Sequence, residues 1–302
     1  MGRSIGLLEP EPSNIIASLS RFSRKSCKEI QKMKLGFDVY PAVQYGNESD
    51  FYFDDQTLLN LILENLFHHQ GPPVYPYIHA TSQHTPLSGS FIEKMAQLLP
   101  LAVKFKSKNI CVHLPVEKCD NTHELVELLT SYDFLRLLEQ YPISLDLENN
   151  WHDSWFGFSE NIKKFFDLLE KKLDEKAKKD LFHYFGITFD SGHFFAQYDS
   201  AGRDVSEGLT EFFRVHGSKI RTLHLHGNDG SGDQHLCFTS GIPSRSEKFL
   251  NYQNILLQKI QDLELFSKSN MDTYDIVIIS EIGSPFTWKE FKEHTRLIFK
   301  NI

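Results

Sequence analysis

The segment Gly186-Ile187-Thr188-Phe189-Asp190 is a short β-rich run that ends on a carboxylate. Runs of this kind return along the chain and alternate with longer amphipathic stretches, which is the pattern of strands and helices in turn. The predicted strands are residues 4–8, 35–40, 74–79, 109–113, 143–148, 186–190, 220–226 and 275–281. The predicted helices are residues 14–33, 56–67, 91–105, 122–139, 159–182, 206–215, 251–266 and 288–299.

Eight strands, each followed by a helix, predict an α/β fold of the (β/α)8 TIM-barrel type. The alternative is a doubly wound open sheet, which also alternates strands and helices. No Gly-rich phosphate loop follows any of the predicted strands, and this disfavours the open sheet. The sequence contains no evident linker and no short-period repeat, so residues 1–302 are predicted to form a single barrel domain.

The composition is that of a globular protein with a substantial core. The chain has 302 residues, of which 40% are hydrophobic and 24% charged, and it includes 25 Phe. No apolar run approaches the roughly 18 residues that a membrane span requires. The four cysteines form no CxxC pair, which favours a reducing, cytoplasmic setting. The net charge is −8 without a basic block, which argues against affinity based on the phosphate backbone of nucleic acid.

Six of the predicted strands end at or near a residue type that binds metals. These residues are His79, His113, Glu148, Asp190, His224 and Glu281. In a closed parallel barrel the carboxyl ends of the strands converge on one mouth, where such enzymes have their active sites. Imidazoles and carboxylates gathered there form a mixed nitrogen and oxygen set suited to zinc or manganese.

Three further residues extend this set. A turn is predicted after Asp190, where Gly192 permits a bend that brings His193 over the mouth. Asp233 and His235 are alternate residues of a segment predicted to be extended, so they share one side of it. Cys111 shares a strand face with His113, and as an unpaired thiol it is predicted to be a packing residue. The aromatic segment 151–158 is predicted either to wall a substrate pocket or to cap the barrel.

The order of these motifs resembles that of the xylose isomerase-like TIM barrels, a superfamily that contains endonuclease IV and the sugar phosphate isomerases and epimerases. The resemblance covers about residues 4–282. It is carried by Ile78-His79, Val112-His113, Glu148-Asn149, Phe189-Asp190-Ser191-Gly192-His193, His224-Leu225-His226-Gly227-Asn228-Asp229, Asp233-Gln234-His235 and Ser280-Glu281.

Carried over residue by residue, the resemblance to endonuclease IV implies a site for three divalent metals. The first would be held by His79, His113 and Glu148, the second by Glu148, Asp190, His224 and Glu281, and the third by His193, Asp233 and His235. Bridged metals of this kind suit phosphoester hydrolysis. Glu148, Glu281 and His193 are the predicted catalytic residues. His224 and His226 share a face of their strand, and His224 is the preferred ligand.

The resemblance to ketose 3-epimerases implies a different chemistry with fewer ligands. Glu148, Asp190, His224 and Glu281 match a single-metal site in which two glutamates exchange a proton at a sugar carbon. That interpretation assigns no metal role to His79, His113, Asp233 or His235, and this surplus favours the multi-metal interpretation. Eight other histidines are predicted to be ordinary core or surface residues: His68, His69, His84, His123, His152, His183, His216 and His294.

Two departures from endonuclease IV bear on the substrate. The loop before Asp233 is short and lacks arginine, and Ala80-Thr81-Ser82-Gln83 lacks a bulky DNA-penetrating pattern. The predicted function is therefore metal-dependent hydrolysis of a phosphoester, with a small phosphorylated or sugar-like substrate favoured over duplex DNA and no membrane partner. The alternative is a metal-dependent isomerase or epimerase of a sugar or sugar phosphate. A non-catalytic binding barrel is a third hypothesis, but it would predict missing ligands, and none is missing.

Overall fold

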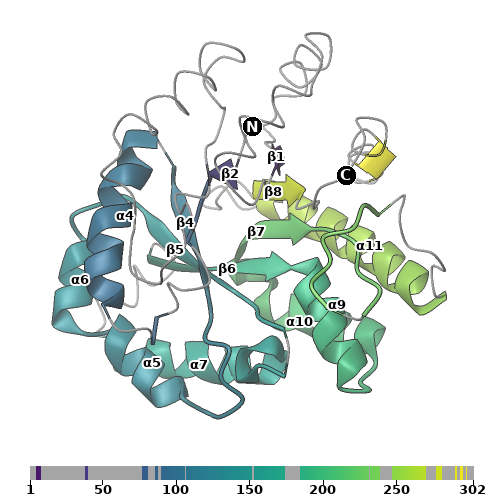
Figure 1. Ribbon diagram of the computed structural model, residues 1–302, viewed down its shortest axis with the longest axis horizontal. Coiled ribbons are helices and arrows are strands. Elements are labelled where there is room, and N and C mark those ends of the chain that lie inside the picture. The colour runs from purple at the N-terminus through teal and green to yellow at the C-terminus, as the bar shows by residue number, and fades with distance from the viewer. Residues whose placement is uncertain are drawn as a thin grey trace, which may run out of the picture.

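A computed structural model describes a parallel sheet surrounded by helices (Figure 1). The residues that it describes are 5–7, 38–39, 77–80, 86–87, 90–105, 107–151, 153–173, 184–230, 232–238, 247–269, 277–280, 290, 293–294 and 297. The predicted helices 14–33 and 56–67 and the predicted site residue Glu281 lie outside these ranges, and the predicted helix 288–299 lies largely outside them.

The strand order identifies the sheet as a barrel. The strands are β1 (Ile5–Leu7), β2 (Asp38–Val39), β3 (Tyr77–His79), β4 (Asn109–His113), β5 (Ser144–Glu148), β6 (Phe185–Asp190), β7 (Ile220–Leu225) and β8 (Val277–Ser280). Each strand from β2 to β7 pairs in parallel with the next one in the chain, and β8 also pairs with β1. A doubly wound sheet reverses its order at a switch point, whereas a barrel places the last strand beside the first. This order excludes the open sheet.

All eight predicted strands are present, and the predicted site residues that lie within the described ranges are found at or near the ends expected of them. Residues 109–113 form a strand with the predicted bounds. The parallel register places His113 beside Glu148, and Asp190 beside His224. The ends of these neighbouring strands therefore lie at one level of the barrel.

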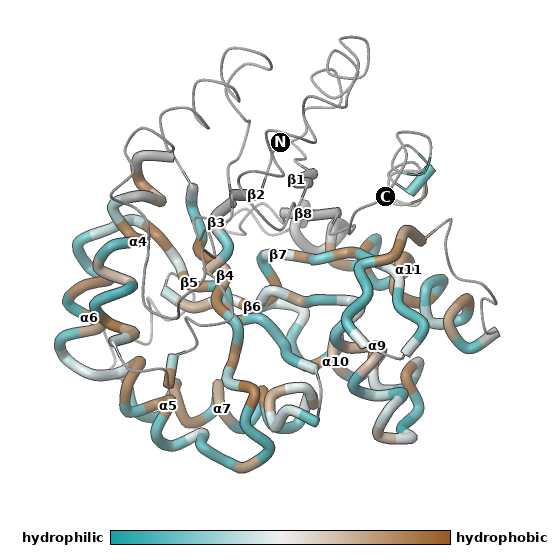
Figure 2. Tube along the Cα trace, in the orientation of Figure 1, coloured by the Kyte–Doolittle hydropathy of each residue, from teal (hydrophilic) through white to brown (hydrophobic). Residues whose placement is uncertain are grey.

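The helices lie outside the strands. They are α4 (Phe91–Phe105), α5 (Thr122–Leu129), α6 (Tyr132–Leu138), α7 (Ser159–Lys172), α9 (Ser191–Ser200), α10 (Val205–His216) and α11 (Glu247–Ser269). Short 3-10 turns occur at Trp155–Gly157 and Gly217–Lys219. Hydrophobic and hydrophilic segments alternate along α5, α6 and α7 in Figure 2, as expected of helices with one face against a sheet. Among the described residues, no helix is both long and apolar enough to cross a bilayer.

Two helical predictions were wrong in detail. Residues 122–139 were predicted as one helix, but the chain forms α5 and α6, because Ser131 adopts an extended backbone and caps α6 through the amide of Phe134. A turn was predicted after Asp190, but α9 begins at Ser191. Residues 191–198 are all buried, so this helix has no polar stripe by which the sequence could identify it.

Aromatic residues fill the layer between the sheet and the helices around α9 and α10. Phe189 of β6 points away from the barrel interior, and its ring centroid lies 5.0 Å from that of Phe212 and 5.0 Å from that of Phe213. Phe194 of α9 stacks on Tyr198 at 4.2 Å. This packing fixes the position of β6 and α9, which carry part of the candidate site.

Candidate metal centre

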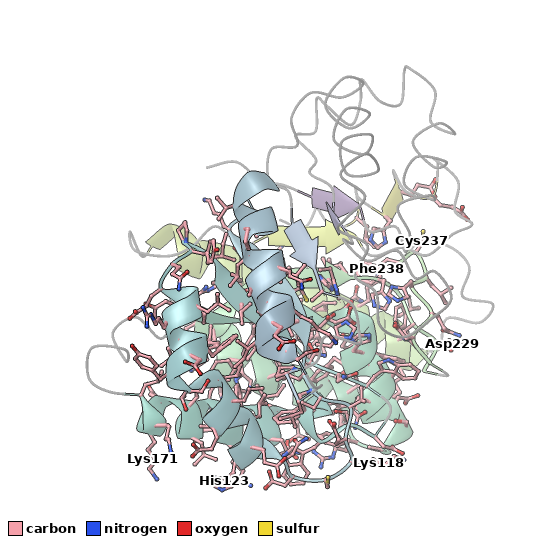
Figure 3. All side chains as sticks on the ribbon, turned by 60° about the vertical axis from the view of Figure 1, so that its left-hand side comes forward. Lys118, His123, Lys171, Asp229, Cys237 and Phe238 are labelled. Carbon is pink, nitrogen blue, oxygen red and sulfur yellow. The ribbon has the colours of Figure 1, made fainter. Side chains whose placement is uncertain are left out.

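The loops that follow the strands gather at one end of the barrel. In Figure 3, Lys118 and Asp229, which follow β4 and β7, lie toward the right of the view, and Lys171, at the end of α7, lies toward the left. Three groups of side chains at the strand ends have donor atoms within 4.8 Å of one another and can hold a metal ion. We name them by their carboxylates. The Glu148 cluster is His79, Cys111, Glu148 and His224, the Asp190 cluster is Glu148, Asp190 and His193, and the Asp233 cluster is His226, Asp233 and His235.

Glu148 stands at the centre of the site, because its two carboxylate oxygens face different sets of ligand atoms. Oε2 lies 3.1 Å from His79 Nε2, 2.8 Å from His113 Nε2 and 3.2 Å from Cys111 Sγ. Oε1 lies 3.0 Å from His224 Nδ1 and 3.8 Å from His193 Nδ1. The carboxylate is 1% exposed. Glu148 is therefore placed to bridge two positions, one on each side of it.

Asp190 joins the second set of ligand atoms to the start of α9. Its Oδ1 accepts a hydrogen bond of 2.6 Å from the backbone amide of His193, which makes it the N-cap of the helix. Both of its carboxylate oxygens lie 3.1 Å from His226 Nε2. Asn149 holds the backbone of Asp190 on both sides, accepting from its amide at 2.7 Å and donating to its carbonyl at 3.1 Å. The end of β5 is thereby fixed to the end of β6.

The loop between β7 and α11 brings Asp233 and His235 over the mouth. The loop is closed by an antiparallel bridge between Gly227 and Leu236, and the Asn228 side chain donates to the carbonyl of Gly232 within it. Asp233 Oδ2 lies 2.9 Å from His235 Nε2 and 3.2 Å from His193 Nε2.

The contact between Asp233 and His235 was predicted from an extended segment, but the local backbone differs. His235 has a φ of 49°, so it lies in the left-handed region and the segment is not extended there. The two side chains meet because the loop turns at this residue, and not because alternate residues of a strand share one side.

Three imidazoles have their tautomer fixed by a backbone carbonyl. Nδ1 of His79 donates to Ala80 at 2.7 Å, that of His193 to Asn149 at 3.0 Å, and that of His226 to Gly227 at 3.3 Å. Since a carbonyl only accepts, Nε2 is left as the nitrogen that faces a carboxylate in each case. Outer hydrogen bonds of this kind orient histidine ligands in metal sites.

Burial and mutual contacts shift the ionisation of the cluster residues. Burial opposes the charged form of Glu148, but the charges and hydrogen bonds of His113 and His224 outweigh it, so the pKa of Glu148 lies well below its usual value. Burial lowers the pKa of His79. Burial by itself would also lower the pKa of His193, but the charge of Asp190 and the hydrogen bond to Asp233 outweigh it and raise this pKa well above the usual value. Glu148 is thus held ionised in a buried place.

The site is closed on the barrel side and open on one flank. His79, Glu148 and His224 are no more than 1% exposed, whereas His113 is 20% and His235 26% exposed at the side chain. Trp151, half-buried, stacks on His193 with ring centroids 6.5 Å apart. The start of the aromatic segment 151–158 thus lies against a ligand imidazole, while Phe156 is fully buried in the core.

Comparisons with known proteins agree with this architecture. No family model matches the chain. An uncharacterized protein of Methanocaldococcus jannaschii is 26% identical over 192 residues, and the alignment spans 62% of this chain and 65% of that protein. The chain thus matches just under two thirds of the length of this relative.

Solved structures match along almost the full length. A D-tagatose 3-epimerase-like protein has a TM-score of 0.59 at 18% identity, covering 100% of this chain and 97% of its own. A xylose isomerase domain-containing protein of Salmonella typhimurium LT2 has a TM-score of 0.59 at 18% identity, covering 99% and 96%. The ASFV AP endonuclease, solved as AsfvAP:AG, has a TM-score of 0.55 at 16% identity, covering 99% and 96%. The chain has the fold of the xylose isomerase-like TIM barrels.

In this barrel, eight of the nine predicted ligands lie within the described residues and gather at one mouth. They are His79, His113, Glu148, Asp190, His193, His224, Asp233 and His235. The ninth, Glu281, follows β8 directly in sequence and lies outside the described residues. The division among positions differs from the expected one: His224 is grouped with His79 and Glu148, His193 is grouped with Glu148 and Asp190, and His113 belongs to none of the three clusters.

Three residues at the mouth were not predicted to take part. His226 was set aside in favour of His224, yet both lie at the site, one against Asp190 and the other against Glu148. Cys111 was predicted to be packing, but its thiol contacts Glu148. Asn149 was not assigned a role. The alternation of residues on a strand was the available signal for Cys111 and His226.

Gly192 is required for a different reason from the one predicted. It lies in the first turn of α9, and a Cβ atom there would lie 1.9 Å from Cε1 of the His226 ring. The glycine leaves room for an imidazole and does not supply a bend. Glycine commonly occurs where another group approaches the backbone closely, as the His226 ring does here.

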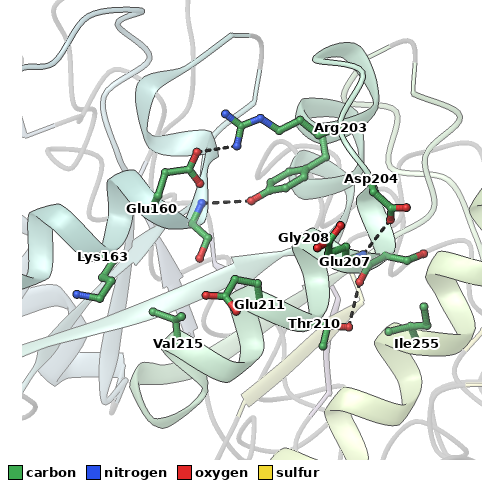
Figure 4. A pocket seen from close by; sticks show the side chains of 13 residues that line it. Glu160, Lys163, Arg203, Asp204, Glu207, Gly208, Thr210, Glu211, Val215 and Ile255 are labelled. Atoms are coloured by element: carbon green, nitrogen blue, oxygen red, sulfur yellow. Dashed lines mark hydrogen bonds and ion pairs between the residues drawn. The ribbon is translucent and has the colours of Figure 1, made fainter.

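A hollow lies among the outer helices of the barrel (Figure 4). It has a volume of about 720 Å³ and is lined by residues of α7, α10 and the loop between α9 and α10. One ion pair spans two of its lining residues, with Arg203 2.6 Å from Glu160. None of the three clusters borders this hollow, so it is separate from the candidate metal centre.

Proposed function

We propose that the chain is a metal-dependent enzyme that hydrolyses a phosphoester at a site of two or three divalent ions, zinc or manganese. The observation that carries this proposal is that imidazole Nε2 atoms face carboxylate oxygens at short distances. His79 and His226 have Nδ1 committed to a carbonyl, so a neutral ring turns the Nε2 lone pair toward a carboxylate oxygen. Two lone pairs about 3 Å apart repel unless a cation lies between them or beside them.

The residues fit such cations in number, spacing and chemistry. Two atoms that each lie about 2.1 Å from one tetrahedral zinc ion are roughly 3.4 Å apart. The contacts between candidate ligand atoms at this mouth range from 2.8 Å, between His113 Nε2 and Glu148 Oε2, to 3.8 Å, between His226 Nε2 and Asp233 Oδ1, which brackets that spacing. Asp233 Oδ1 is buried and has no hydrogen-bond partner among the described residues, as expected of an oxygen reserved for a ligand.

The division of roles follows from where the side chains lie. Glu148 would bridge two ions, since each of its oxygens faces a separate set of imidazoles. His226, Asp233 and His235 would hold a third on the open flank. When bound, such ions activate water and neutralise the charge of a phosphoester. Trp151 would form one wall beside the substrate, and the protonated His193 would hold a proton near Asp233.

A small phosphorylated substrate is favoured over duplex DNA. The net charge of −8 and the compact loop from Gly227 to Leu236, closed by its own hydrogen bonds, support this preference. A sugar or sugar phosphate isomerase or epimerase is the second candidate, because Glu148, Asp190 and His224 also serve a one-metal scheme. The described ligands outnumber what that scheme needs, and the surplus is His79, His113, Asp233 and His235.

The experiment uses this surplus. Protein loaded with zinc or manganese is assayed against an abasic-site duplex, small phosphodiesters, phosphomonoesters and ketoses, for the wild type and the His235→Ala variant. We expect hydrolysis of a small phosphoester by the wild type, and in the variant the loss of about one metal per chain and a rate reduced roughly 100-fold or more.

The control variant is His123→Ala, which removes an imidazole from the first turn of α5, away from the three clusters. It should keep both metal content and rate. Epimerisation of a ketose without phosphate release, with His235→Ala unchanged in metal and rate, would replace the hydrolase with the epimerase. Incision of the duplex alone would overturn the substrate preference.

A further inference from the structure

Cys111 lies inside the barrel, below the mouth, among residues that bind metals. It is in β4, where its Cα is paired with that of His79 on one side and that of Asp146 on the other. The residue is 0% exposed. A thiol used only for packing is expected among apolar side chains. This thiol instead lies 3.2 Å from Glu148 Oε2.

The donor set around Cys111 is complete enough for one ion. Four ligand atoms lie within 4.8 Å of one another. They are the Cys111 Sγ, one imidazole nitrogen each of His79 and His224, and one carboxylate oxygen of Glu148. These four atoms come from β3, β4, β5 and β7, so the barrel itself fixes their spacing. One sulfur, two nitrogens and one oxygen match the number and types of ligand found around tetrahedral zinc.

The other two clusters contain no sulfur. The Asp190 and Asp233 clusters offer only nitrogen and oxygen. Thiolate sulfur is a soft ligand and favours zinc or cobalt, whereas carboxylate and imidazole sets also accept manganese, and carboxylates accept magnesium. The chain therefore presents two kinds of position at one mouth, with the sulfur at the buried end.

Resting on the metal-dependent function proposed above, we propose that Cys111 is a thiolate ligand of the ion in the Glu148 cluster. It makes this position selective for Zn²⁺ or Co²⁺ over Mg²⁺ and Mn²⁺. On binding, the S–H bond breaks, the metal–sulfur bond forms, and the proton leaves to solvent, with no change of oxidation state. The neighbouring positions remain open to harder ions, so the site can hold two different metals at once.

The test replaces the metal with Co²⁺, whose bond to a thiolate gives a charge-transfer absorption in the near ultraviolet that nitrogen and oxygen ligands do not give. The Cys27→Ser/Cys119→Ser/Cys237→Ser variant keeps Cys111 as its single thiol. We expect Co²⁺ to produce the sulfur band in this variant and in the wild type. In Cys111→Ser, which keeps a hydrogen-bond donor to Glu148, the band should be lost and the apparent dissociation constant for Zn²⁺ should rise at least about 10-fold.

Competition then measures selectivity. Excess Mn²⁺ should leave the sulfur band of the triple variant in place, and it should compete with Zn²⁺ more effectively in Cys111→Ser than in the wild type. Visible cobalt bands without a sulfur band in the triple variant would overturn the proposal, even if Cys111→Ser failed to fold.

The phosphoester assay separates this proposal from the function on which it rests. A sulfur band without phosphoester turnover would retain Cys111 as a ligand and remove the hydrolase. Turnover without a sulfur band would do the reverse. Absence of any bound cobalt would overturn both.

Discussion

Gly192 shows how a single atom can decide whether a ligand fits. A methyl group at this position would lie 1.9 Å from the His226 ring, well inside the distance that any contact tolerates. We expect Gly192→Ala to displace His226, to remove about one metal per chain from the Asp233 cluster, and to lower the free energy of unfolding by about 1–3 kcal/mol. Metal analysis and urea unfolding measure the two effects.

The matched control for this substitution is Gly217→Ala. A Cβ at Gly217 would meet Leu263 at 3.2 Å, at the end of a side chain, and the position lies away from the clusters. It should keep its metal and lose less stability. If Gly192→Ala binds as much metal per chain as the wild type, the His226 ring can adopt another position without losing the metal, and its close packing against Gly192 does not position it.

The alternation of residues along a strand predicted which side chains face the site, but not which of them reach the ligand atoms. His224 and His226 share a face, and the sequence prediction preferred His224 as the ligand. The structure places both at the site, because His224 contacts the carboxylate of Glu148 and His226 contacts that of Asp190. Cys111 lies two residues before His113 on the same face, and it reaches the site because the Glu148 side chain extends between them. How far a side chain of the neighbouring strand extends depends on the tertiary structure, so it cannot be predicted from the sequence of one strand.

Helices α7 and α10 are joined by a buried histidine outside the metal centre. His216 Nε2 donates to the backbone carbonyl of Ser159 at 3.0 Å, and burial lowers the pKa of His216 to about 4. The unfolded chain takes up this proton near pH 6.5, whereas the folded chain does so only near pH 4. The contribution of neutral His216 to stability is therefore complete above pH 6.5 and is lost as the pH falls toward 4.

We expect the unfolding free energy of the wild type to fall by about 2 kcal/mol more than that of His216→Gln between pH 7 and pH 5. The amide of the variant does not titrate. Urea unfolding of both proteins in the presence of a chelator excludes the metal ligands as the source of the difference. Parallel loss of stability in the two proteins would show that His216 becomes protonated without opposing the fold.

The elements differ in how well the sequence predicts them, and burial is the reason. Helix α4 was predicted with its observed bounds, Phe91–Phe105, because one face of it meets solvent and gives a period. Helix α9, from Ser191 to Ser200, was predicted as a turn because both of its faces are covered. The strands were predicted from short β-rich runs, and the candidate ligands lie at or near the ends of six of these runs.

For the molecule as a whole, the alternation of strands and helices was enough to predict the barrel, and the pairing of β8 with β1 bears it out. The reaction is less constrained by the fold, since proteins similar in structure include an epimerase-like protein and an AP endonuclease. The proposed hydrolase and the alternative epimerase differ in the number of ions that each would need at the mouth. A one-metal enzyme has no use for Asp233 and His235, and a multi-metal hydrolase requires them.

Anomalous diffraction at the zinc edge, from crystals of the zinc-loaded protein, counts and places these ions in one measurement. We expect one peak beside Glu148 Oε2 near His79 and Cys111, a second beside Glu148 Oε1 near Asp190, and a third among His226, Asp233 and His235. A single peak at the mouth, with Asp233 and His235 still in direct contact with each other, would contradict the multi-metal site.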